Sequence, residues 1–135
     1  MRGAIPAGVD AHNYYGRSEN ERRGAKTICT SHVLAAFGID SSQYHYSGKV
    51  TQRCSILRRH GFAARSRMSR LPKNCSVGAA RTLMPFKGDP AGTRYMIRVN
   101  GHALLLDHSG ATIVDTSPRL RDRRKILDIR AIFPR

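Results

Sequence analysis

Residues 93–115 read TRYMIRVNGHALLLDHSGATIVD, and their pattern predicts three consecutive strands. Thr93 to Val99 alternates, with Tyr95, Ile97 and Val99 on one face, which is typical of a strand. Asn100-Gly101 is the strongest signal for a two-residue hairpin turn in the chain. His102 to Asp107 then forms the return strand, and Ala111 to Asp115 forms a third strand after a further turn. We therefore expect an antiparallel sheet in the second half of the chain.

The sequence before this stretch has helical periodicity. From Thr27, apolar positions recur in a pattern that fits a short helix ending at Gly38. A second helix is predicted around Val50, Cys54 and Leu57, which share one helical face, with Gly61 as its C-terminal signal. Residues 62–74 are expected to be an Arg- and Ser-rich connector. A third short helix follows, carried by Val77, Ala80, Leu83 and Met84 and ended by Pro85.

The last apolar segment is ambiguous. Leu127, Ile129, Ala131 and Phe133 alternate as in a strand, whereas Ile126, Ile129 and Phe133 also suit a helix; we favour the strand. Helices followed by antiparallel strands predict an α+β fold, with N-terminal helices packed on a small antiparallel sheet. A length of 135 residues allows a single domain spanning 1–135. Within this domain we expect 1–26 to be an extended or partly mobile lead-in, and 27–135 to be the core with a basic C-terminal tail.

Composition excludes several classes of protein. No run of 18 apolar residues exists, so no membrane partner is expected, and the first residues lack the apolar core of a signal peptide. Three widely spaced cysteines fit neither a disulfide framework nor a zinc site and indicate a reducing compartment. Of these, Cys54 is expected in the core and Cys75 as an exposed thiol. We expect a cytoplasmic protein, in the host cytoplasm if a phage encodes it.

The net charge of +15 is unevenly distributed. Eight basic residues and no acid lie between Arg53 and Arg81, and more basic residues follow near the end of the chain. Such a surface suits nucleic acid or an acidic protein face. The residues expected to bind such a partner are Arg53, Arg58, Arg59, Arg65, Arg67, Arg70, Lys73, Arg121, Arg123 and Arg124.

Three polar residues stand where a nucleophilic site needs them. Cys29 lies at the predicted start of the first helix, where unpaired N–H groups and the helix dipole lower the pKa of a thiol. His102 opens one strand and Asp115 closes the next, so an antiparallel pairing brings them together. A thiolate, an imidazole base and an acid that orients it are the parts of an acyl-transfer site.

Each of these residues also has a structural interpretation. Cys29 can be a small buried apolar residue, and Asp115 can cap a turn before Thr116. A metal site is not expected, because neither the His102/His108 pair nor the Cys29/His32 pair supplies the four ligands of a closed zinc site. No cofactor is expected either.

The stretches Cys29-Thr-Ser-His-Val-Leu-Ala-Ala-Phe-Gly38, Gly92 to Asp107 and Gly110 to Thr116 resemble the papain-like cysteine peptidase superfamily. The likeness is to its small bacterial and phage-borne members, near the peptidases that cleave double-glycine leader peptides. The resemblance implies a papain-like fold, with Cys29 as nucleophile, His102 as general base and then acid, and Asp115 as the group that orients His102. No Gln precedes Cys29 where the superfamily has one for the oxyanion hole; Asn13 and Asn20 are the available amides.

Two functions are therefore expected from the sequence. The first is a cysteine peptidase or amidase that cleaves a peptide or isopeptide bond in a peptide or protein substrate, with the basic surface recruiting an acidic partner. The alternative is a protein of the same fold without turnover, which binds nucleic acid or an acidic protein and can act on a phage host.

Overall fold

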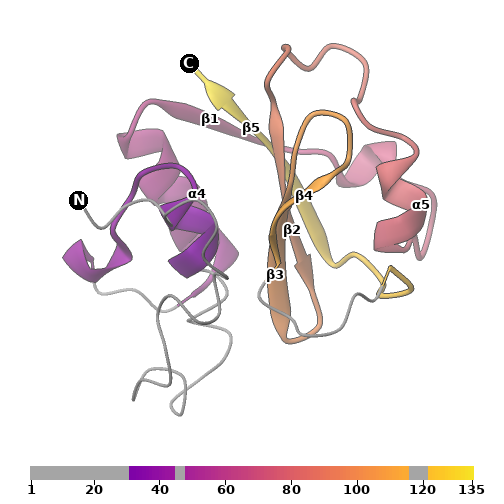
Figure 1. The fold of residues 1–135 in the computed structure, drawn as a ribbon, viewed down its shortest axis with the longest axis horizontal. Helices are drawn as coiled ribbons and strands as arrows, with labels where there is room; N and C mark the ends of the chain where they lie inside the picture. The colour runs from indigo at the N-terminus through magenta and orange to yellow at the C-terminus, as the bar shows by residue number, and fades with distance from the viewer. Residues whose placement is uncertain (1–30, 45–47, 116–121) are drawn as a thin grey trace.

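The computed structural model describes residues 31–44, 48–115 and 122–135. The described part has an α+β fold, as predicted (Figure 1). In chain order it contains helical residues 31–35, the 3-10 helix η1 (Ser41–Gln43), helix α4 (Val50–Arg59), strand β1 (Phe62–Ser66), the 3-10 helix η2 (Met68–Arg70), helix α5 (Val77–Arg81), and strands β2 (Arg94–Val99), β3 (His102–Leu106), β4 (Thr112–Asp115) and β5 (Asp128–Pro134).

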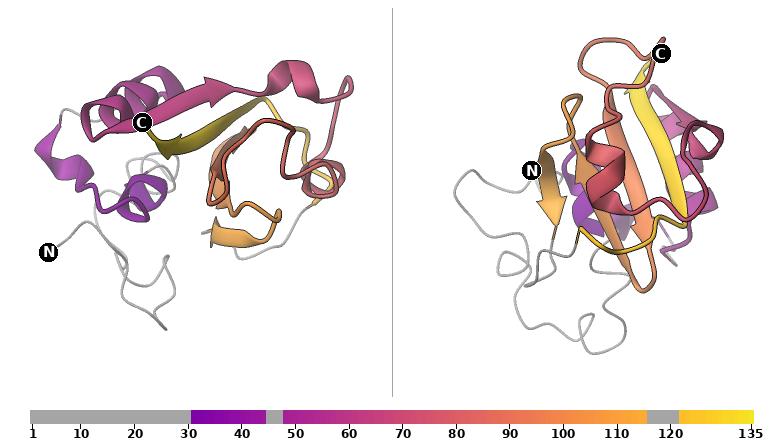
Figure 2. Two further views of the ribbon diagram at one scale, coloured as in Figure 1. Left: turned by 90° about the horizontal axis from the view of Figure 1, so that it is seen from above. Right: turned by 90° about the vertical axis from the view of Figure 1, so that its right-hand side faces the viewer.

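The five strands form one sheet in the order β1-β5-β2-β3-β4, and every neighbouring pair is antiparallel. The predicted hairpin is confirmed, because Val99 pairs with His102 across a turn in which Gly101 has φ +73°. The predicted strand near the end of the chain is also confirmed as β5. β5 lies inside the sheet between β1 and β2, as both views of Figure 2 show.

Helices cover both faces of the sheet. Helical residues 31–35 and α4 lie on one face, which we call the α4 face, and α5 lies on the other, the α5 face (Figure 1). Because side chains alternate along a strand, Met96 packs with Leu34 and Leu57 on the α4 face. Tyr95 and Ile97 pack on the α5 face together with Val99, so the predicted grouping of these three residues is confirmed.

The two N-terminal helical signals behave as expected. α4 buries Cys54 and Leu57 and is followed by Gly61 at φ +88°. The helix at 31–35 ends where Gly38 adopts φ +79°, and the Ile39 N–H donates to the Leu34 carbonyl oxygen at 3.2 Å. Such a left-handed glycine satisfies the last carbonyls of a helix. The predicted beginning of this helix and the lead-in at 1–26 lie outside the described residues.

Three sequence predictions in the middle of the chain are wrong. The connector predicted at 62–74 contains β1 and η2, because Phe62 to Ser66 pairs with β5, a partner that the local sequence does not show. The third helix is shorter than predicted: α5 ends at Arg81, and Leu83 is 41% exposed. Cys75 is buried rather than exposed, since it packs with Val77 under α5.

No described helix is long and apolar enough to cross a membrane.

A buried carboxylate links the loop before β2 to the sheet. The Asp89 side chain is fully buried; it pairs with Arg67, with Nη2 and Oδ1 2.5 Å apart, and accepts a 2.7 Å hydrogen bond from the Tyr95 hydroxyl. The Phe86 N–H donates to the same hydroxyl at 3.1 Å. Burial alone would raise the pKa of Asp89, but the hydrogen bonds from Arg67 and Tyr95 outweigh it and hold this pKa below its usual range. Burial and the Asp89 bond raise the pKa of Tyr95 to about 12.

We expect Asp89→Asn to lower the free energy of unfolding by about 3 kcal/mol at neutral pH, because it leaves the Arg67 guanidinium without its charged partner. A carboxyl with a lowered folded-state pKa stabilises the fold above its unfolded pKa, near 4, and loses this contribution as the pH falls through the folded pKa. The difference between wild type and variant should therefore be constant above about pH 5 and shrink below about pH 4.

Urea unfolding across this pH range measures the difference. The matched control is Asp122→Asn, because Asp122 pairs with Arg81 but is 53% exposed. Exposed pairs contribute about 0–1 kcal/mol. An equal loss in both variants would contradict the role given to Asp89.

Candidate active site

The structure brings His102 and Asp115 together. Their Nε2 and Oδ1 atoms are 2.5 Å apart. The contact follows from the strand register: Asp115 pairs with Leu104, and His102 lies two residues before Leu104 on the same face of β3. The side chains of His102 and Asp115 are 9% and 10% exposed. The juxtaposition expected from the sequence is therefore present, at the end of the sheet where β3 begins and β4 ends.

The hydrogen bond defines which imidazole nitrogen can act as a base. An ionised carboxylate only accepts hydrogen bonds, so with Asp115 ionised the contact requires the tautomer in which Nε2 of His102 carries the proton. In that tautomer Nδ1 is the basic nitrogen of the ring, which is the role that a general base requires. Because both side chains are largely shielded from water, the contact holds the ring more firmly than a surface pair would.

The turn between β3 and β4 sets the position of Asp115. Asp107 Oδ1 accepts hydrogen bonds from the N–H groups of Ser109, at 2.8 Å, and Ala111, at 2.9 Å. The Ser109 hydroxyl donates to the same oxygen at 2.7 Å, and these bonds lower the pKa of Asp107. Gly110 has φ +92° and its carbonyl oxygen accepts from Arg81 Nη1 at 2.7 Å, which ties the turn to α5.

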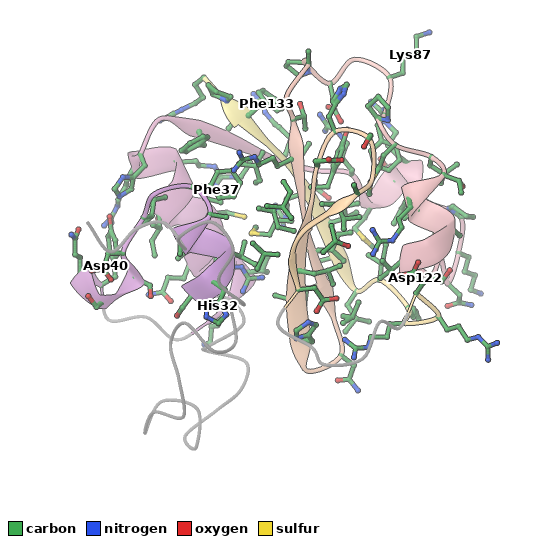
Figure 3. All side chains as sticks on the ribbon, viewed as in Figure 1. His32, Phe37, Asp40, Lys87, Asp122 and Phe133 are labelled. Carbon is green, nitrogen blue, oxygen red and sulfur yellow. The ribbon has the colours of Figure 1, made fainter. Side chains whose placement is uncertain are left out.

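Cys29, the predicted nucleophile, lies outside the described residues. The helix that follows it does have a defined orientation. Its C-terminal end contacts the start of β2, where Arg94 Nη1 donates to the Ala36 carbonyl oxygen at 2.9 Å. Its first turn, marked by His32, lies toward the end of the sheet that holds the β2–β3 turn (Figure 3). By alternation, however, His102 shares the α5 face with Leu104, whereas Val33 and Leu34 pack on the α4 face.

Arg53 is wrongly predicted as a partner-binding residue. It is fully buried in α4; its Nη1 donates to the Gly48 carbonyl oxygen at 2.7 Å and its Nε to Met96 Sδ at 3.4 Å. The periodicity Val50, Cys54, Leu57 placed Arg53 outside the apolar stripe. The buried face of α4 is wider than this stripe, because it also includes Ile56, and Arg53 lies within it.

Other predicted binding residues are engaged with the protein itself. Arg67 pairs with buried Asp89, Arg70 Nη1 donates to the Lys87 carbonyl oxygen at 3.1 Å, and Arg58 Nη2 donates to the Ala64 carbonyl oxygen at 3.1 Å. Arg124 is half-buried, and Arg121 lies outside the described residues. Exposed positions are occupied by Arg59, Arg65, Lys73 and Arg123.

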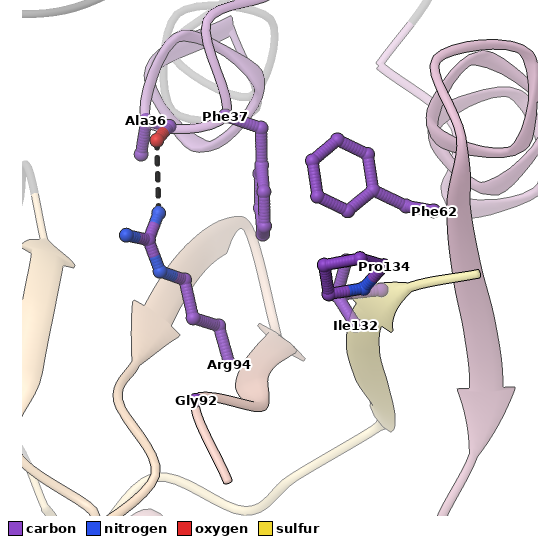
Figure 4. A pocket seen from close by; sticks show the side chains of 7 residues that line it. All are labelled: Ala36, Phe37, Phe62, Gly92, Arg94, Ile132 and Pro134. Atoms are coloured by element: carbon purple, nitrogen blue, oxygen red, sulfur yellow. Dashed lines mark hydrogen bonds between the residues drawn. The ribbon is translucent and has the colours of Figure 1, made fainter. Parts of the chain in front are cut away.

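Within the part of the chain that the structure describes, no group of three or more His, Cys, Asp or Glu residues is placed to hold a metal ion. Sequence reasoning missed a cavity of about 320 Å³ lined by Ala36, Phe37, Phe62, Gly92, Arg94, Ile132 and Pro134 (Figure 4). Its lining comes from four separate segments, so no local sequence pattern signals it.

Comparison with known proteins finds no match among family models, curated proteins or solved structures. Among the described residues, the His102–Asp115 pair is an arrangement with a recognised chemical use.

We expect Gly110→Ala to destabilise the β3–β4 turn. A Cβ at this position would lie 2.7 Å from the Arg81 carbonyl oxygen, a clash with backbone that no rotamer relieves. Gly88→Ala is the matched control, because Gly88 has nearly the same φ, +91°, with no atom within 4 Å of the added Cβ. The left-handed backbone should cost about 1–2 kcal/mol in both variants, and the clash about 1–3 kcal/mol more at Gly110. Denaturant unfolding measures both, and equal losses would rule out the close approach.

Proposed function

We propose that this protein is a cysteine hydrolase of the peptidase or amidase type, with Cys29 as nucleophile, His102 as proton carrier and Asp115 as the group that orients His102. The observation that carries the proposal is the 2.5 Å contact between Nε2 of His102 and Oδ1 of Asp115. The papain-like fold implied by the sequence resemblance is part of the same proposal.

The burial of the pair supports a chemical role. A solvent-exposed His–Asp contact contributes little, since water competes for both groups. Here both side chains are about nine-tenths buried at one end of the sheet, beside the apolar cluster that Val99 and Leu104 belong to. Burying these polar groups costs free energy that apolar residues would not. Buried pairs of titratable groups of this kind are typical of catalytic sites, where an acid or base must be kept in a fixed position.

The proposed reaction uses each residue once in each half. Nδ1 of His102 takes the thiol proton of Cys29, and the thiolate attacks the carbonyl carbon of the substrate. The tetrahedral intermediate collapses, the C–N bond breaks, and the imidazolium protonates the leaving amine. In the second half, water gives a proton to Nδ1 and attacks the thioester carbonyl; the C–S bond then breaks, the imidazolium returns its proton to the Cys29 sulfur, and the acid product leaves. Asp115 stabilises the imidazolium in both halves without taking its proton.

The proposal places one demand on the chain before Ser31. Cys29 must reach Nδ1 of His102 at the end of the sheet. The helix at 31–35 begins toward this end (Figure 3), which supports the proposal. His102 lies on the α5 face of the sheet, whereas this helix packs on the α4 face. In this proposal Cys29 and His102 therefore meet past the end of the sheet, and not between the helix and the sheet.

We expect Cys29 to react with iodoacetamide well below the ordinary thiol pKa of about 8.5, because coupling to His102 keeps it as a thiolate. Cys54 and Cys75 serve as internal controls. Both are buried, and burial raises the pKa of each thiol, although Arg130 opposes this effect at Cys54. Mass spectrometry of alkylated peptides across a pH series measures all three rates in one sample.

The variants distinguish catalytic coupling from accessibility. His102→Ala should lower the alkylation rate of Cys29 at about pH 6 by roughly tenfold or more, and Asp115→Asn should lower this rate by less. His108→Ala is the matched control, because His108 is also half-buried in the β3–β4 hairpin and has no role in the proposed reaction. If the alkylation rate of Cys29 depends on pH in the same way in wild type and His102→Ala, the hydrolase proposal fails.

A second candidate function rests on a separate observation. Among the described residues, the exposed side chains of Arg59, Arg65 and Lys73 make no hydrogen bond or ion pair, so their charge is available to a partner. Together with the net charge of +15, they favour binding of nucleic acid or an acidic protein surface. In this alternative the fold does not turn over substrate, and the His102–Asp115 pair is structural.

We expect duplex DNA to bind with an affinity that falls steeply with salt, and replacing Arg59, Arg65 and Lys73 by Gln should reduce the slope by about 0.9 for each lost phosphate contact. Fluorescence anisotropy over a salt series, with a Cys29→Ser background, measures this without catalysis. Competition by polyglutamate, an acidic polypeptide, shows whether the basic surface binds any polyanion or prefers DNA. An absence of binding at low salt would remove the nucleic-acid candidate.

A further inference from the structure

The cavity of about 320 Å³ is separate from the candidate active site. It lies at the start of β2, where Gly92 and Arg94 line it, whereas His102 pairs with Val99 at the far end of the same strand. Five residues of extended chain separate Arg94 from Val99, which corresponds to about 17 Å. A ligand in this cavity would therefore not touch His102 or Asp115.

Most of the lining is apolar. The rings of Phe37 and Phe62 meet edge to face, with centroids 5.1 Å apart and planes at 67°. Ile132 and Pro134 of β5 lie below the Phe62 ring (Figure 4). The volume is roughly twice that of an engineered 150 Å³ cavity that binds benzene. There is room for one aromatic ring with a short substituent.

Arg94 brings a positive charge to this apolar cavity. Its Nη1 donates to the Ala36 carbonyl oxygen at 2.9 Å, and its guanidinium lies 5.4 Å from the centroid of Phe37. A guanidinium has five N–H donors, and in the described part of the chain the bond to Ala36 is the only hydrogen bond that the Arg94 guanidinium donates. No acid lines the cavity, and no carboxylate pairs with Arg94 among the described residues.

These contacts also fix the guanidinium in place. The bond to Ala36 and the stacking on Phe37 hold it at the edge of the cavity, so little side-chain freedom is lost when a ligand binds. A fixed guanidinium with free donors pairs best with a carboxylate, because the two groups match in geometry.

We propose that this cavity binds a small aromatic carboxylate, with its ring against Phe37, Phe62 and Ile132 and its carboxylate on the free N–H groups of Arg94. The site is independent of the hydrolase proposal, since it uses none of the same residues.

A purely structural role for Arg94 makes a different prediction. If Arg94 only caps the carbonyl of Ala36 and packs on Phe37, its replacement lowers stability but gives the cavity no preference for an anion. The comparison of an anionic probe with a neutral one of the same shape separates these two roles.

The test uses the full chain and two probes, 3-phenylpropionate and 3-phenylpropan-1-ol, titrated into ¹⁵N-labelled protein. We expect the acid to shift the amide signals of Phe37, Gly92 and Ile132, and to bind about tenfold more tightly than the alcohol. Arg94→Gln should remove this preference while the alcohol binds as before. Arg98→Gln is the matched control, because Arg98 is exposed on the same strand and the same face and its loss changes the net charge equally.

A further variant covers the case in which Arg94→Gln does not fold. Ala36→Met fills the cavity without removing the guanidinium, and it should abolish binding of both probes. Equal affinity of the two probes for wild type would overturn the proposal. So would a loss of affinity for 3-phenylpropionate that is equally large in Arg94→Gln and Arg98→Gln. Signal shifts that avoid Phe37, Gly92 and Ile132 would also overturn it.

Discussion

The pairing of β5 with both β1 and β2 is the interaction on which the rest of the structure depends. It places a segment from the end of the described chain at the inside of the sheet, and so joins β1 with α4 to the β2–β3–β4 meander. With Ile132 on one face and Ile129 on the other, β5 contributes to both apolar cores. The cavity beside Arg94 exists only because Ile132 and Pro134 are delivered to it by this pairing.

The described arginines are used largely to hold the fold together. Arg53 fills a buried position in α4, Arg67 neutralises Asp89, and Arg81 ties α5 to the β3–β4 turn. Guanidinium groups suit this work, because several donors on one side chain can satisfy carbonyl oxygens that lack a backbone partner. The charge excess of the sequence is thus partly internal, and the surface available to an anionic partner is smaller than composition alone indicates.

The sequence predicted what short-range patterns determine. The Asn100-Gly101 turn fixes the β2–β3 register, and that register together with the next strand brings His102 to Asp115. What it missed depends on distant partners: β1 forms because β5 pairs with it, and Arg53 is buried because the buried face of α4 extends beyond the apolar stripe. The cavity combines residues from four segments. Cys29 lies outside the described residues, so its meeting with His102 stays a prediction.

The order of the strands has a consequence for synthesis. About 60 residues separate the end of β1 from the start of β5, and at about 5–20 residues per second a ribosome takes roughly 3–12 s to make them. During this interval β1 has emerged beside α4 with no strand on either side. The guanidinium of Arg58 covers the Ala64 carbonyl at the outer edge, but the inner edge waits for β5. The nascent chain is therefore most open to wrong strand pairing, and to chaperones, in these seconds.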